Sequence, residues 1–335
     1  MNLMVRLKDV VMSFLRGFRK TAVFAITNRC NCRCVMCDIY ESPPREVRLE
    51  DAKKILSFLR RNKFLIVYFT GGEPTLHPNI IELVKYANDL GLVTAMTTNG
   101  TASRETIARL KDAGLYLLTV SFDHWDPKIC EGIRRHRDIK YKQESSVSYC
   151  KEVGLRTHTL TFLNSYVLRD GVEKLVRYVN EKLGVPFAFC YPVKTGSEAY
   201  SLGRNLSEEE LSYKNLEDNL KKLLMMKKMG FAIANLGTYI EDTIRIHEGK
   251  KPNFYCKGGE DVFYIDWSGN VYPCFVKEKL FNIVKDEEPV FLKNVKCNDC
   301  LTNCFREPSI LAHSILSPLL IKEAFYSYRT RKLFI

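Results

Sequence analysis

Short apolar runs alternate with helical patterns over the first two thirds of the chain. Six runs read as strands: Val23–Thr27, Phe64–Thr70, Val93–Thr98, Tyr116–Phe122, Leu155–Phe162 and Pro186–Val193. The intervening helical spacing is clearest over Glu50–Arg61, Ile80–Leu90, Arg104–Ala113 and Gly171–Leu183. Wholly apolar strands suit a parallel sheet that is buried on both faces, and a repeated strand–helix order favours right-handed crossovers. The pattern therefore predicts an α/β fold, a partial (β/α)6 TIM-like barrel.

The pattern changes after the sixth strand. Residues 194–205 read as a linker, and Glu208–Met229 has apolar residues at helical spacing. A hairpin is predicted from Val262–Asp266 and Asn270–Tyr272, within a cysteine-rich stretch of short β pieces. We therefore expect four parts: a basic amphipathic N-terminal helix over 1–20, the barrel over 21–235, a small α+β extension over 236–308, and a basic amphipathic helix over 309–335.

Charge is concentrated in the two tails. Residues 1–20 carry a net charge of +4 and residues 311–335 carry +3, out of +12 for the whole chain. Apolar and basic faces on one helix are typical of segments that lie on a membrane surface, but such helices also pack on barrels. Both interpretations stay open. The chain has no recognition motif for nucleic acid, so we expect no nucleic-acid partner despite the positive charge.

Cysteine usage indicates a compartment. The chain contains 12 cysteines, and its first apolar run lacks the features of a secretory signal. Clustered cysteines in a chain without such a signal are typical of metal ligands in a reducing environment. We therefore expect a cytoplasmic protein, peripheral on the membrane if the tails bind lipid. No stretch has the ~20 uninterrupted apolar residues that a membrane span needs.

Three cysteines follow the first strand in a C-x3-C-x2-C spacing: Cys30, Cys34 and Cys37. Soft thiolate ligands suit iron–sulfur clusters, and three of them would leave one iron of a four-iron cube open to another molecule. A zinc loop or a disulfide patch is the alternative. This loop resembles the cluster loop of the radical S-adenosylmethionine (radical SAM) enzymes at all three ligand positions. The resemblance implies a [4Fe–4S] cluster whose open iron binds S-adenosylmethionine, while Cys32 is interpreted as a spare thiol.

The ends of strands two to four carry further candidates. Gly71, Gly72 and Glu73 end the second strand, where glycines allow a close backbone approach and a carboxylate can pair with an ammonium group. They match the Gly-Gly-Glu motif with which the radical SAM family holds the amino group of its cofactor. Asn99, Ser121 and Asp123 follow the next two strands and resemble stretches that the family places around the cofactor, although turn chemistry would explain them as well.

Five cysteines lie in the C-terminal extension. The resemblance extends to the SPASM or shorter twitch extensions of this family, through the Gly269-x4-Cys274 step. It implies a second iron–sulfur cluster on Cys256, Cys274, Cys297 and Cys300, with Cys304 as a replacement ligand. A structural zinc ion on the same thiolates is the alternative. The remaining cysteines, Cys130, Cys150 and Cys190, lie among apolar neighbours and are interpreted as core residues.

The resemblance implies an oxidoreductase that cleaves S-adenosylmethionine reductively and uses the resulting radical to take hydrogen from an unactivated C–H bond. The substrate would be a peptide, a lipid or a small molecule, and a lipid would agree with tails that bind a membrane surface. A flavodoxin or ferredoxin would supply the electron. The alternative from another class is a non-catalytic iron–sulfur or zinc scaffold that serves as a binding module.

Overall fold

The computed structural model describes residues 15–18, 20–195 and 215–314. The predicted N-terminal helix and almost all of the basic C-terminal segment lie outside these residues, so their membrane interpretation stays a prediction. In the described part of the chain, no helix combines the length and the apolar character needed to cross a membrane.

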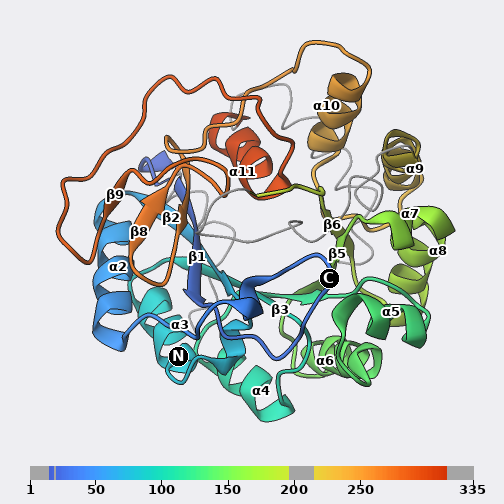
Figure 1. Cartoon of the computed structure of the whole chain (residues 1–335), viewed down its shortest axis with the longest axis horizontal. Coiled ribbons are helices and arrows are strands. Elements are labelled where there is room, and N and C mark those ends of the chain that lie inside the picture. Colours follow the sequence, from blue (N-terminus) through green and yellow to red (C-terminus); the bar gives the residue numbers. More distant parts are fainter. Residues whose placement is uncertain (1–14, 19, 196–214, 315–335) are drawn as a thin grey trace.

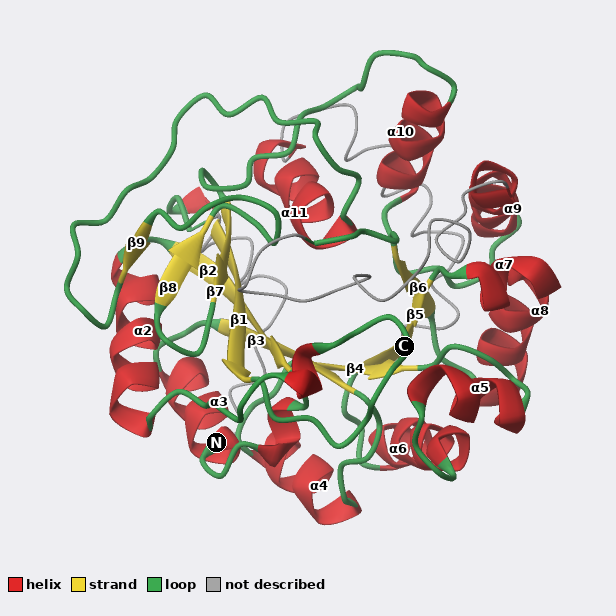
Figure 2. Ribbon diagram, viewed as in Figure 1, coloured by secondary structure: helices red, strands yellow, loops and turns green. Residues whose placement is uncertain are grey.

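Six parallel strands form the curved sheet that the sequence predicts, in the order β6-β5-β4-β3-β2-β1 (Figures 1 and 2). Their bounds are Lys20–Thr27 (β1), Phe64–Gly71 (β2), Val93–Thr98 (β3), Leu117–Ser121 (β4), Thr157–Phe162 (β5) and Phe187–Cys190 (β6). Because all six run in one direction, their carboxyl ends meet at one edge. In barrels of this kind, that edge is where the functional site lies.

Helices cover the outer face of this sheet (Figure 2). They are Leu49–Arg61 (α2), Ile80–Asp89 (α3), Arg104–Asp112 (α4), Pro127–Arg134 (α5), Ile139–Glu152 (α6), Ser165–Asp170 (α7) and Val172–Arg177 (α8), the last continued by a π-helical turn over Tyr178–Leu183. Helices Leu216–Lys228 (α9), Gly237–His247 (α10) and Asn303–Ser314 (α11) follow the barrel. The sequence pattern did not separate α5, α6 and α10, whose polar residues obscure the helical spacing.

The predicted hairpin is present but is not a separate unit. Strand β7 (Val262–Ile265) pairs in parallel with β1, and β8 (Asn270–Tyr272) and β9 (Phe281–Asn282) continue the sheet by antiparallel pairing. The expected α+β extension therefore lengthens the barrel sheet to nine strands. Helix α11 lies between the two ends of this curved sheet, beside β1 and β6 (Figure 1).

The two faces of β1 contact different halves of the molecule. Phe24 and Ile26 belong to the main core beneath the helices. Val23 and Ala25 point to the other side, where they pack with Tyr264, Phe275 and Phe305 of the C-terminal extension in a second cluster that also contains Cys256 and Cys274. This alternation follows from the pleat of a strand, whose successive side chains face opposite ways. The C-terminal cysteines are thereby fixed against the first barrel strand.

Candidate functional site

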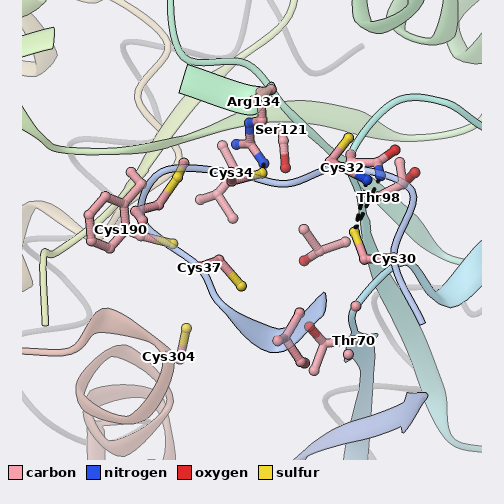
Figure 3. Close-up of a pocket in the computed structure, with 18 of the residues that line it drawn as sticks. Cys30, Cys32, Cys34, Cys37, Thr70, Thr98, Ser121, Arg134, Cys190 and Cys304 are labelled. Carbon is pink, nitrogen blue, oxygen red and sulfur yellow. Dashed lines mark hydrogen bonds between the residues drawn. The ribbon is translucent and has the colours of Figure 1, made fainter. Parts of the chain in front are cut away.

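The three cysteines of the N-terminal loop line a cavity at the carboxyl ends of the barrel strands (Figure 3). The loop leaves β1 and is anchored to the end of α5, because Val35 N–H donates to the carbonyl of Ile133 at 2.9 Å. Cys37 N–H donates to the carbonyl of Cys34 at 3.1 Å, which turns the chain between the last two thiols. Cys30, Cys34 and Cys37 therefore face one space although the loop has no regular secondary structure.

Polar donors surround two of these sulfur atoms. Cys32 N–H lies 3.4 Å from Cys30 Sγ, and Arg134 Nη1 lies 3.7 Å from Cys34 Sγ. A hydrogen bond from Cys32, assisted by the charge of Arg134, lowers the pKa of Cys34 to about 7, whereas burial raises the pKa of Cys37 to about 12. Metal binding requires all three as thiolates, so it must displace a proton from Cys37.

The donor set of the N-terminal loop is compatible with an iron–sulfur cluster. Among the described residues, no three His, Cys, Asp or Glu side chains converge closely enough to hold a single metal ion. A four-iron cube binds each thiolate through a different iron, so its ligands stand farther apart than those of one zinc ion. Three thiols on the wall of one cavity, two of them with lowered pKa values, are compatible with that wider arrangement.

Gly71 and Gly72 also line the cavity, and chain packing requires both. A Cβ at Gly71 would lie 2.1 Å from the carbonyl oxygen of Thr27, and one at Gly72 would lie 2.2 Å from that of Arg29. Gly71 also has a φ of +139°, a backbone conformation that glycine tolerates. Gly72 N–H donates to Thr27 at 2.8 Å. The glycines therefore bring the end of β2 directly against the start of the cysteine loop.

The carboxylate of Glu73 does not line the cavity. It is fully buried and accepts hydrogen bonds from Thr98 Oγ1 at 2.9 Å and from Asn99 N–H at 2.6 Å, with two more from Thr75. Burial raises the pKa of Glu73, and these bonds oppose the rise. In this position the carboxylate joins the end of β2 to that of β3, and its expected contact with an ammonium group stays a prediction.

Replacing Glu73 tests this arrangement. In Glu73→Gln, an NH2 group would face the N–H of Asn99, and a buried donor left unsatisfied costs ~1–3 kcal/mol. We expect chemical denaturation to show a loss of that size, while Glu50→Gln, at an exposed position on α2, changes little. If stability is unchanged but S-adenosylmethionine binds roughly 10- to 150-fold more weakly, Glu73 contacts the ammonium group directly instead.

Asn99 and Ser121 line the cavity, and their predicted contact with the cofactor stays a prediction. Asn99 Nδ2 donates to Asn31 Oδ1 at 2.7 Å and lies 3.9 Å from Cys30 Sγ, so it connects β3 to the cysteine loop. Gln143 of α6 donates to the carbonyl of Asn99 at 3.2 Å and so fixes the backbone at the end of β3. These contacts leave the hydroxyl of Ser121, at the end of β4, among the groups that can meet a bound molecule.

Asp123 does not line the cavity, whereas its partner Arg134, which was not predicted from the sequence, does. Asp123 is fully buried, and its Oδ2 accepts from Arg134 Nε at 2.5 Å. Arg134 is the one charged side chain that the described residues contribute to the cavity wall. Its pKa is raised, because burial, which would lower it, is outweighed by Asp123 and the Cys34 sulfur. The sequence feature that could have indicated Arg134 is its place at the end of the helix that follows β4.

The four predicted C-terminal ligands meet in a separate hollow. Cys256, Cys274, Cys297 and Cys300 all line it, and Cys304 does not. Cys256 and Cys297 form an isolated antiparallel bridge, with Cys256 N–H donating to the carbonyl of Cys297 at 3.0 Å. Burial raises the pKa of Cys256 to about 11 and that of Cys274 to about 12. Four thiols in one hollow match the ligand number of an iron–sulfur cluster or of a structural zinc ion.

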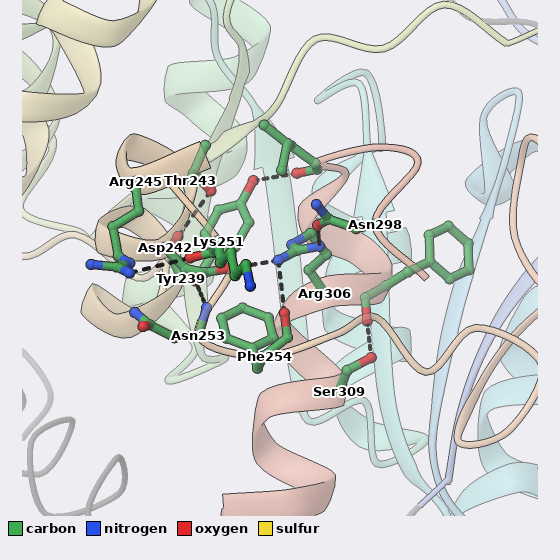
Figure 4. Close-up of polar contacts among 12 residues, drawn as sticks. Tyr239, Asp242, Thr243, Arg245, Lys251, Asn253, Phe254, Asn298, Arg306 and Ser309 are labelled. Carbon is green, nitrogen blue, oxygen red and sulfur yellow. Dashed lines mark hydrogen bonds and ion pairs between the residues drawn. The ribbon is translucent and has the colours of Figure 1, made fainter. Parts of the chain in front are cut away.

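A buried ion pair fixes the loop between two of these cysteines (Figure 4). Arg306 of α11 and Asp242 of α10 are both fully buried and lie 2.6 Å apart, Nη2 to Oδ2. Arg306 Nη1 also donates to Asn298 Oδ1 at 2.8 Å, and Asn298 stands between Cys297 and Cys300. Asp242 in turn accepts from Asn253 N–H. Arg306 therefore ties the cysteine loop to α10 and to the chain that precedes Cys256.

Comparison with known proteins identifies the class. Residues 24–179, nearly half of the chain, match the family model described as the radical SAM superfamily. These residues are a radical SAM domain of that superfamily. Its members use a [4Fe–4S] cluster and S-adenosylmethionine, in agreement with the cofactors that the sequence predicted.

Individual relatives cover parts of the chain. PqqA peptide cyclase of Bradyrhizobium diazoefficiens is 31% identical over 143 residues, 42% of this chain and 38% of that protein. Fe-coproporphyrin III synthase of Methanosarcina barkeri is 26% identical over 212 residues, 61% of this chain and 52% of that protein. The chain thus spans about half or less of these two relatives. The structure of Streptococcus suis SuiB bound to S-adenosylmethionine aligns with a TM-score of 0.63 at 17% identity, over 84% of this chain and 68% of SuiB, which shows a shared fold.

Proposed function

We propose that the protein cleaves S-adenosylmethionine reductively at a [4Fe–4S] cluster on Cys30, Cys34 and Cys37, and that it takes hydrogen from a C–H bond of its substrate. The observation that carries this proposal is one cavity that combines the three thiols with Gly71, Gly72, Asn99, Ser121 and Arg134. When bound, the cluster and S-adenosylmethionine supply a 5′-deoxyadenosyl radical. A flavodoxin or ferredoxin would supply the electron.

The chain's own residues would bind and orient the cofactor. An amino-acid carboxylate needs a cation, and Arg134, held by Asp123, is the charged group available in the described wall. The ammonium group would meet backbone carbonyls around Gly71 and Gly72. Glu73 would hold those strand ends in place from behind, through Thr98 and Asn99. A cavity of fixed shape also keeps water away from a reactive intermediate.

We propose an elongated substrate such as a peptide segment. Tyr191 and Val193 line both this cavity and a second hollow that reaches Cys300. A molecule that occupies both hollows would extend from the N-terminal thiols to the C-terminal cysteine loop. The peptide cyclase among the relatives is named for a peptide, which supports this choice over a compact ligand. The second set of cysteines would then hold an auxiliary cluster close to the bound substrate.

The defining experiment measures cofactor cleavage. Anaerobic protein reconstituted with iron and sulfide, then reduced by dithionite, is expected to convert S-adenosylmethionine into 5′-deoxyadenosine and methionine, which liquid chromatography detects. Protein that carries both clusters but releases no 5′-deoxyadenosine would be the non-catalytic iron–sulfur scaffold instead. The proposal of a lipid substrate depends on the basic tails, which lie almost entirely outside the described residues.

A further inference from the structure

Two cysteines that neither metal site uses meet in the wall of the central cavity. Cys190 ends β6, and Cys304 stands in the first turn of α11. Both line the cavity that contains the N-terminal thiols. Figure 3 shows them on the side opposite Cys30 and Thr98, with Cys34 and Cys37 in between. Cys304 does not line the hollow of the other four C-terminal cysteines, and Cys190 lines the cavity while it also packs against buried side chains.

The fold brings the segments that carry these two thiols together. The residues next to them in the chain meet, since Tyr191 N–H lies 3.4 Å from Asn303 Oδ1. Tyr239 donates to the carbonyl of Leu301 at 2.7 Å and so fixes the chain that leads into α11. Segments more than a hundred residues apart therefore bring two thiols to the wall of one cavity.

Cys190 differs in its surroundings from the other cysteines outside the metal sites. The neighbouring Cys304 thiol, together with burial, raises the pKa of Cys190 above its ordinary value. By contrast, Cys130 and Cys150 are fully buried among apolar side chains and do not line the cavity. A thiol in contact with the reaction space is chemically significant, because an S–H bond is weaker than the C–H bond that a carbon radical forms.

We propose that Cys190 and Cys304 form a thiol pair that donates a hydrogen atom to a carbon radical in this cavity. The transfer breaks one S–H bond and forms one C–H bond, which leaves a thiyl radical on sulfur. The neighbouring sulfur can share the unpaired electron. A hydrogen atom from an external thiol reductant would restore the pair, leaving a thiyl radical on that reductant. This inference rests on the proposed function, since the radical must first be formed.

Deuterium from solvent reports the donor, because S–H protons exchange with water and C–H protons do not. Reconstituted protein is exchanged into D2O and given S-adenosylmethionine and dithionite, without a substrate and without added thiol. The mass of the released 5′-deoxyadenosine is then measured. We expect a monodeuterated product from the parent protein and loss of most of that deuterium in Cys190→Ala and Cys304→Ala. The control Cys150→Ala, at a buried cysteine outside the cavity lining, should keep it.

The outcomes separate the two proposals. If no 5′-deoxyadenosine forms in any variant, the proposed function fails. If it forms with the same deuterium content in the parent and both pair variants, or if Cys32→Ala alone removes the deuterium, the thiol pair is not the donor. A second measurement needs no turnover. Diamide should join Cys190 to Cys304 by taking two electrons and two protons, and peptide mapping should find that disulfide. Its absence would show that the two thiols do not meet and would overturn the pair.

Discussion

Replacing Cys30, Cys34 and Cys37 together by Ala is expected to remove about half of the bound iron and all cleavage of S-adenosylmethionine. Two four-iron clusters give about eight irons per chain, and the three thiols of the β1 loop hold one of them. Without these ligands the cofactor has no iron to bind. Iron and sulfide analysis of anaerobically purified protein, together with assay of 5′-deoxyadenosine, measures both effects.

The matched variant replaces Cys256, Cys274, Cys297 and Cys300 by Ala. It should also lose about half of the iron, yet it should still cleave S-adenosylmethionine, because these thiols line a different hollow. Cys150→Ala serves as a control for cysteine loss itself. Stoichiometric zinc at the second site would contradict the auxiliary cluster and leave the first assignment intact. Full iron in the triple variant would contradict the first.

Replacing Arg306 by Met is expected to lower the free energy of unfolding by about 3–5 kcal/mol, because Asp242 is left as an unpaired buried carboxylate. Burial already raises the pKa of Asp242 in the presence of Arg306. Since the folded state then holds a proton that the unfolded state releases, the variant should recover stability as the pH falls below the raised pKa. Urea denaturation at several pH values measures both effects.

A double variant separates the charge from the tie to the cysteine loop. Asp242→Asn combined with Arg306→Met removes the unpaired charge and should restore part of the stability. It cannot restore the bond from Arg306 to Asn298, so iron at the second site should stay low while cleavage of S-adenosylmethionine persists. If the single variant unfolds at the same urea concentration as the parent, the ion pair does not contribute to the free energy of unfolding. If second-site iron is unchanged in both, Asn298 does not position the loop.

The linear sequence was sufficient for the features that depend on near neighbours. All six barrel strands lie where the apolar runs predicted them, because a strand buried on both faces needs consecutive apolar residues. The Cys30–Cys37 loop and Gly71–Gly72 were recognisable for a similar reason. The spacing of the three cysteines and the need for glycine at a close backbone approach are both visible within a few residues. The alternation of predicted strands and helices then placed each motif at the end of a strand.

The direction of the polar side chains could not be read in the same way. Glu73 and Asp123 were both expected to contact the cofactor, which stays a prediction. Neither lines the cavity, and their carboxylates accept hydrogen bonds from Asn99 and Arg134. A carboxylate can meet a ligand or the donors of an adjacent strand with similar energy. The choice depends on whether neighbouring backbone N–H groups are already satisfied, which is a property of the assembled sheet.

Local pattern therefore determined the barrel and the location of its motifs, and tertiary structure decided which distant residues share a site. Parallel pairing of β7 with β1, the approach of Arg134 to Cys34 and the contact of Tyr191 with Asn303 all join segments far apart in the chain. The cost of closing a loop grows only slowly with its length, so sequence separation hardly restricts such pairings. They are fixed when the apolar faces of β1 are buried on one side by helices and on the other by the C-terminal extension.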